Sequence, residues 1–98
     1  MTELIFPAHP GEIVRDEILP AFGLNIVQTA DVLKVARPNL NNVLNGKRAL
    51  SHELALKLEA AFGVSAELLT TAQNNFDLAQ ARARIGKITA GIRRLGAA

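Results

Sequence analysis

The sequence contains no cysteine and only two histidines, His9 and His52. Without cysteine the chain forms no disulfides, so we expect it in a reducing cytoplasm. Neither histidine has a serine or acid partner at a recognisable catalytic spacing, and the two do not form a metal-ligand pattern. No glycine-rich phosphate loop follows a strand pattern either. The sequence therefore predicts a protein that is not an enzyme and that has no metal site and no cofactor.

Long apolar runs and most aromatic residues are also missing. No apolar run approaches the roughly 18 residues of a membrane span, and no basic-then-apolar leader begins the sequence, so we expect neither a membrane anchor nor a signal peptide. The aromatic residues are four Phe, with no Tyr or Trp, which argues against a stacking platform for single-stranded nucleic acid.

What the sequence does have is helix-forming apolar residues. The chain has 98 residues, 49% of them hydrophobic, and Leu and Ala dominate. No alternating apolar-polar run is long enough for a core strand. We therefore expect a single all-α domain that is large enough to bury a modest core.

The central segment 25–48 has the pattern of two short helices joined by a tight corner. Asn25 and Gln28 form a capping-box pair at the start of the first helix. Pro38 suits the first turn of the second helix, and Asn45-Gly46 is expected to end it. The outward side of this second helix is rich in amides and nearly uncharged, which favours contacts with base edges.

Charge is segregated along the chain. The net charge is −3 over residues 1–24, +3 over 25–50, −3 over 51–79 and +5 over 80–98. Basic charge thus gathers in the two-helix segment and in the C-terminal tail, where phosphate binding would place it. For the tail alone, a solvated charged surface explains the pattern equally well.

The segment 25–48 resembles the helix-turn-helix of the Cro and phage-repressor class, the XRE family. The resemblance is carried by a small residue in the first helix and apolar residues around the corner, namely Ala30, Leu33, Val35, Leu40 and Val43. It implies a five-helix lambda-repressor-like DNA-binding domain over residues 9–80, with an N-terminal arm at 1–8 and a basic amphipathic extension, as helix or tail, at 81–98.

Four residues depart from the family pattern. Thr29 stands at an apolar position, and Ile26 stands where repressors often carry Gln. Lys34 replaces the preferred glycine of the corner, and a positive φ there would cost about 1 kcal/mol. Ala36 leaves the second helix without a side-chain N-cap.

The run HPGEIVRDEILPAFGL, beginning at His9, narrows the resemblance to the HigA-type antitoxins. Similarity extends from about Pro7 to Gln80 and includes the segment 55–63. It implies a homodimer that represses its own operon by binding double-stranded operator DNA and neutralises a cognate RNA-cleaving toxin. The alternatives are a stand-alone repressor without a toxin partner and a protein-interaction module that no longer binds DNA.

Candidate DNA contacts follow from the resemblance and from side-chain chemistry. The predicted base readers lie on the second helix of the motif, with the arginine directed to guanine and the amides to adenine: Arg37, Asn39, Asn41 and Asn42. The predicted phosphate contacts lie at the start of the first helix and in the exit turn: Asn25, Ile26, Asn45, Lys47 and Arg48.

The remaining helices are expected to frame this motif. A helix from Gly11 should bury Val14, Ile18 and Phe22, with Pro20 ending its regular part. Ser51 and Ser65 should cap two later helices. The last of these carries an apolar seam, which packs either on the domain's own core or, as we favour, on a second copy: Leu69, Ala72, Phe76, Ala79 and Ala83.

Overall fold

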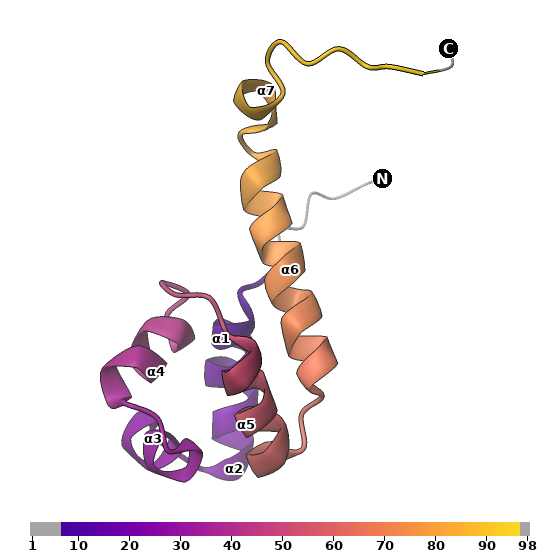
Figure 1. The fold of residues 1–98 in the computed structure, drawn as a ribbon. Coiled ribbons are helices and arrows are strands. Elements are labelled where there is room, and N and C mark those ends of the chain that lie inside the picture. The colour runs from indigo at the N-terminus through magenta and orange to yellow at the C-terminus, as the bar shows by residue number, and fades with distance from the viewer. Residues whose placement is uncertain (1–6, 97–98) are drawn as a thin grey trace, which may run out of the picture.

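The computed structural model describes residues 7–96, and every regular element in that range is a helix (Figure 1). The all-α fold class is therefore confirmed. Most of the predicted N-terminal arm, residues 1–6, lies outside the described residues. No helix within 7–96 is long and apolar enough to cross a membrane.

The first helix consists of three consecutive segments. These are α1 (Pro10–Ile13), the π-helical η1 (Val14–Ile18) and α2 (Leu19–Phe22). Leu19 N–H donates to the Val14 carbonyl, five residues back, just before Pro20, which has no N–H to donate. The prediction that Pro20 ends the regular part of this helix is wrong: the α-helical pattern is interrupted earlier, at Val14–Ile18, and Pro20 lies in the first turn of α2, which continues to Gly23 with φ +67°.

Four further helices complete the domain. They are α3 (Ile26–Leu33), α4 (Arg37–Leu44), α5 (His52–Phe62) and α6 (Ala66–Arg82), followed by the short α7 (Ile85–Ile88). The predicted caps are confirmed, because Ser51 Oγ accepts from Leu54 N–H at 3.1 Å and Ser65 Oγ accepts from Leu68 N–H at 3.2 Å.

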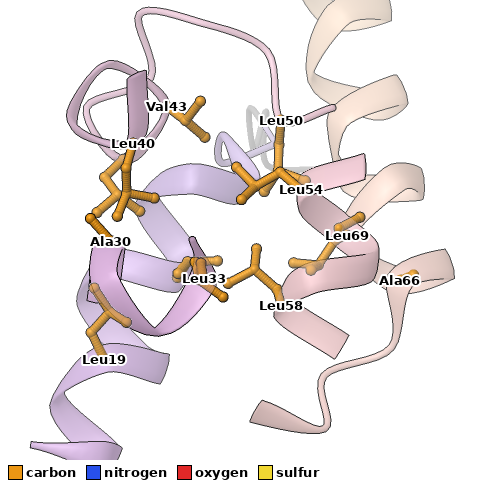
Figure 2. Packing of buried hydrophobic residues seen from close by; sticks show 13 residues of the cluster. Leu19, Ala30, Leu33, Leu40, Val43, Leu50, Leu54, Leu58, Ala66 and Leu69 are labelled. Carbon is orange, nitrogen blue, oxygen red and sulfur yellow. The ribbon is translucent and has the colours of Figure 1, made fainter. Parts of the chain in front are cut away.

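One apolar core holds the helices together. Figure 2 shows how side chains from α3, α4, α5 and α6 meet in it. Its buried members are Val14, Leu19, Ala30, Leu33, Leu40, Val43, Leu44, Leu50, Leu54, Ala55, Leu58, Ala66 and Leu69. Phe22 was expected in this core but is 53% exposed, and its ring instead lies 4.9 Å from that of Phe62.

Helix α6 runs past the bundle, so its C-terminal half stands away from the other helices (Figure 1). The molecule accordingly measures 55 × 32 × 21 Å. Every described residue from 82 to 96 is exposed, including the apolar side chains of Ile85, Ile88, Ile92 and Leu95. The predicted division at residue 81 stays a prediction.

Candidate nucleic-acid interface

Helix α4 divides cleanly into a buried and an exposed side. Leu40, Val43 and Leu44 enter the core and are almost fully buried. Arg37, Asn39 and Asn41 are exposed, and Asn42 is half-buried. All four predicted base readers therefore lie on the side of α4 that the core leaves uncovered.

A very close contact between two backbones positions α4. A Cβ placed on Gly11 of α1 would lie only 1.8 Å from the carbonyl oxygen of Val43, so only glycine allows this approach. Gly11 N–H donates to Nδ1 of the buried His9 at 2.9 Å, which caps α1. The His-Pro-Gly-Glu run therefore holds α4 in position through a contact on the side of α4 that faces the core.

The corner between α3 and α4 is strained at one residue. Lys34 ends α3 with φ +57° and ψ +46°, so it adopts the left-handed conformation for which the family prefers glycine at this corner. Within 7–96 it is the one non-glycine residue with a positive φ. Val35 N–H donates to the Ala30 carbonyl at 3.1 Å and closes the end of α3.

The start of α3 has the predicted capping box. Asn25 Oδ1 accepts from Gln28 N–H at 2.8 Å, and Gln28 Oε1 accepts from Asn25 N–H at 3.0 Å. The box occupies the Asn25 backbone amide, and the phosphate contact assigned to Asn25 stays a prediction. The first-turn amides of Ile26 and Val27 have no acceptor among the described residues.

Thr29 behaves as a core residue despite its hydroxyl. It is fully buried, and its Oγ1 donates to the Asn25 carbonyl at 2.7 Å, so burial leaves no polar atom unpaired. The departure from an apolar residue at this position therefore fits the fold.

The start of α4 has no side-chain cap, as Ala36 predicts. The backbone amides of Arg37 and Asn39 have no acceptor among the described residues, while Pro38 has no amide hydrogen at all. The positive end of the helix dipole and the Arg37 guanidinium thus lie together at an exposed helix start, which attracts anions.

The exit turn after α4 is closed by backbone hydrogen bonds. Lys47 N–H donates to the Asn42 carbonyl at 2.8 Å, and Gly46 has φ +72°. Asn45, Lys47 and Arg48 are all exposed beside the C-terminal end of α4. This places two cations next to the exposed amides.

Sequence reasoning missed Arg15, which lies on the first helix, about 30 residues before the contacts that it makes. Its Nη1 donates to the Leu44 carbonyl and to Asn45 Oδ1, both at 3.4 Å. Its Nε donates to Asp16 Oδ1 at 2.7 Å, and this hydrogen bond lowers the pKa of the Asp16 carboxyl. No local pattern predicts a side chain that reaches another helix.

Between the starts of α3 and α4 lies an open groove of about 640 Å³, lined by Ile26, Arg37, Pro38 and Asn41. Its openness suits a flat macromolecular surface better than an enclosed small ligand. No group of three or more metal-ligating side chains occurs among the described residues.

The predicted dimer seam on α6 is only partly available. Leu69 belongs to the core of its own chain and is 2% exposed, which corrects its assignment to an intermolecular surface. Phe76 is half-buried, and its ring lies edge-on to that of His9 at 4.9 Å. Ala72 and Ala79 are half-buried, and Ala83 is exposed.

A family model described as helix-turn-helix matches residues 14–69. Virulence-associated protein A of Dichelobacter nodosus is 44% identical over 62 residues, which are 63% of this chain and 61% of that protein. The chain therefore spans about three fifths of the length of that relative.

Two solved structures match nearly the whole chain. The Pseudomonas aeruginosa antitoxin HigA with the higBA promoter is 35% identical with a TM-score of 0.81, covering 90% of this chain and 96% of its own. The antitoxin GraA in complex with its operator is 33% identical with a TM-score of 0.83, and the match covers 99% of both chains.

Proposed function

Because the chain belongs to the helix-turn-helix family and is similar to the solved antitoxins HigA and GraA, we propose that it is a sequence-specific, operator-binding antitoxin. In this proposal it acts in the cytoplasm and represses the operon that encodes it and its toxin. The observation that carries the proposal is the exposed polar side of α4, presented on a helix whose other side is locked into the core.

Base reading is assigned to α4 lying in the major groove. Arg37 can donate to guanine, and the amides of Asn39, Asn41 and Asn42 can contact base edges. Each good bidentate contact discriminates between bases by about 1–3 kcal/mol. The rigid attachment of α4 through Gly11 and Leu40 supports this role, because a loosely held helix would not fix the register of these contacts.

Phosphate contacts are assigned to both sides of α4. The backbone amides of Ile26 and Val27 at the start of α3 can bind one phosphate. Asn45, Lys47 and Arg48 in the exit turn can bind another. Such contacts position the protein without reading sequence, so they contribute affinity that falls with salt.

Homodimerisation is part of the proposal. One recognition helix contacts few base pairs, and two copies one helical turn apart, roughly 34 Å, would multiply specificity on a palindromic site. Because Leu69 is buried in the core of its own chain, the proposed dimer seam consists of the four remaining residues, Ala72, Phe76, Ala79 and Ala83.

The seam can be tested with a charge pair on α6. Ala83→Glu places a carboxylate in the seam, whereas Asn74→Glu places one on the opposite side of the helix, at an exposed residue outside the seam. We expect Ala83→Glu alone to lower the mass in solution to that of a monomer. An unchanged dimer mass for both variants would rule out this seam.

The DNA test titrates the region upstream of the gene against random DNA of equal length. We expect tight binding to the upstream region only, and a loss of about 5-fold or more for Arg37→Ala or Asn42→Ala on that region. Asn75→Ala, an exposed amide of α6, is the matched control and should change nothing. Equal affinity of the unaltered protein for both DNAs would instead favour an interaction module that no longer reads DNA.

Toxin neutralisation belongs to the proposal as well, and the likeness to the antitoxins HigA and GraA supports it. The expected partner is an RNA-cleaving toxin encoded next to this gene. Expression of the neighbouring reading frame should arrest growth alone and be tolerated together with this chain. A neighbour that is harmless alone would leave a stand-alone repressor.

A further inference from the structure

Two arginines outside α4 are hydrogen-bonded, directly or through one asparagine, to the side-chain amides of α4 that we propose to contact bases. Arg15 Nη1 donates to Asn45 Oδ1 at 3.4 Å, and Asn45 Nδ2 donates to Asn41 Oδ1 at 3.2 Å. Separately, Arg48 Nη1 donates to Asn39 Oδ1 at 3.0 Å. Asn39 and Asn41 therefore both use their carbonyl oxygen within the protein.

The direction of both chains follows from the chemistry of arginine. A guanidinium has donors only, so the atom that it contacts on Asn39 or Asn45 must be the amide oxygen. With its oxygen towards Arg15, Asn45 presents its NH₂ group to Asn41 and donates to it. The orientation of the amide groups, which a side chain's shape alone does not determine, is thus set by the two arginines.

As a result, the exposed side of α4 presents more hydrogen-bond donors than acceptors to DNA. Asn39 and Asn41 direct their NH₂ groups away from their arginine-led partners, and Arg37 adds further donors. Asn42 differs, because its side chain has no hydrogen-bond partner recorded within residues 7–96, so it can turn either edge to a base.

Guanine and adenine distinguish these two kinds of amide. In the major groove guanine presents two adjacent acceptors and no donor, N7 and O6, so an amide can contact it through its NH₂ group alone. Adenine presents one acceptor and one donor, N7 and N6, so a bidentate contact needs both the NH₂ and the oxygen of an amide. Asn41 would have to pair with adenine through the second lone pair of an oxygen that already accepts from Asn45, whereas its NH₂ group is free to donate to guanine.

We propose that Arg15 and Arg48 are specificity-determining residues, which orient Asn41 and Asn39 to read guanine while Asn42 is left to read adenine. This inference rests on the proposed operator binding and makes it more specific. It replaces the expectation that all three amides read adenine. The operator half-site should accordingly carry guanines at the base pairs contacted by Asn39 and Asn41.

The test reverses the direction of one chain. The full-length protein selects binding sites from a random double-stranded library, and the base pair read by Asn41 is the one whose preference Asn41→Ala abolishes. Asn45→Asp replaces the NH₂ donor by an acceptor of nearly the same shape, so Asn41 must turn its NH₂ towards residue 45 and its oxygen towards DNA. We expect the ratio of guanine to adenine at that base pair to fall about 5-fold or more.

Two further variants separate orientation from charge and folding. Asn75→Asp on α6 adds the same charge at an exposed amide and should leave the guanine preference intact. Arg48→Met frees the Asn39 oxygen and should shift preference at a different base pair, the one that Asn39→Ala identifies. A general loss of affinity without a change in base ratio would show phosphate contacts only and would contradict the proposal.

The remaining outcomes are also decisive. A preference for adenine by the unaltered protein at the Asn41 base pair, or an Asn41→Ala variant that keeps every preference, would overturn this inference but leave operator binding intact. Selection of no consensus by the unaltered protein would overturn operator binding as well.

Discussion

Helix α4 and the segment 83–96 both combine an apolar stripe with polar or basic residues, but the stripe is buried in α4 and exposed in the segment. The stripe of α4 is buried to within 4% of full burial at Leu40, Val43 and Leu44. The stripe of the C-terminal segment, which consists of Ile85, Ile88, Ile92 and Leu95, is between 50% and 80% exposed. An amphipathic pattern therefore identifies which side of a helix is apolar, but not whether the same chain covers it.

The difference follows from what lies opposite each stripe. Helix α4 faces α1 and α3, and its contact with α1 is close enough to require Gly11. The C-terminal half of α6, and the whole of α7, have no other helix beside them in Figure 1. The helix-turn-helix segment 25–48, called the anchored region below, can hold the side chains that contact bases in fixed positions. The C-terminal segment, in contrast, contributes little to the stability of the monomer.

Truncation of one apolar side chain in each region tests this difference in burial. Leu40→Ala removes a side chain that is 1% exposed, and we expect it to lower the free energy of unfolding by about 2–5 kcal/mol. Ile88→Ala removes one that is half exposed and should change the stability of the monomer by less than about 0.5 kcal/mol. Urea denaturation of both variants measures this. A comparable loss for Ile88→Ala would mean that a partner, such as a second copy, covers the segment.

A pair of glycine substitutions tests backbone packing in the same two regions. Gly11→Ala drives a Cβ into the Val43 carbonyl, so α1 or α4 must shift, and we expect a loss of about 1–3 kcal/mol. Gly86→Ala meets no atom within 4 Å and improves helix propensity in α7, so it should be neutral or slightly stabilising. Thermal unfolding followed by circular dichroism compares the two variants. If Gly11→Ala were as stable as the original chain, the close contact would not be what positions α4.

Sequence patterns within a few residues predicted most of the local structure of the anchored region. The Asn25–Gln28 capping box, the positive φ of Lys34 and the missing cap at Ala36 each depend on residues within one turn of the position concerned. The assignment of the polar side of α4 also followed from periodicity alone, because the buried residues recur every three or four positions.

Contacts between distant helices could not be predicted in the same way. Nothing within a turn of Gly11 or Arg15 indicates that Val43 or Asn45 lies opposite. Leu69 fitted a seam pattern on α6, but the path of the chain after Gly63 folds the N-terminal half of α6 onto the core and leaves only its C-terminal half outside. The same pattern along one helix thus serves two environments, which periodicity does not distinguish.

The smallest expected effect concerns the corner that joins α3 to α4. Lys34 holds a left-handed conformation that costs about 1–2 kcal/mol for a residue with a Cβ, and glycine removes that cost while adding about 0.5–1 kcal/mol of backbone entropy to the unfolded state. We therefore expect Lys34→Gly to stabilise the domain by about 0.5–1 kcal/mol. Lys34→Asn removes the same charge and tolerates the conformation less well than glycine, so its gain should be smaller. If both variants raised Tm equally in thermal unfolding, loss of charge rather than relief of strain would be the cause. A gain specific to glycine would show that the anchored region, unlike the C-terminal segment, holds one of its own residues under strain to place α4.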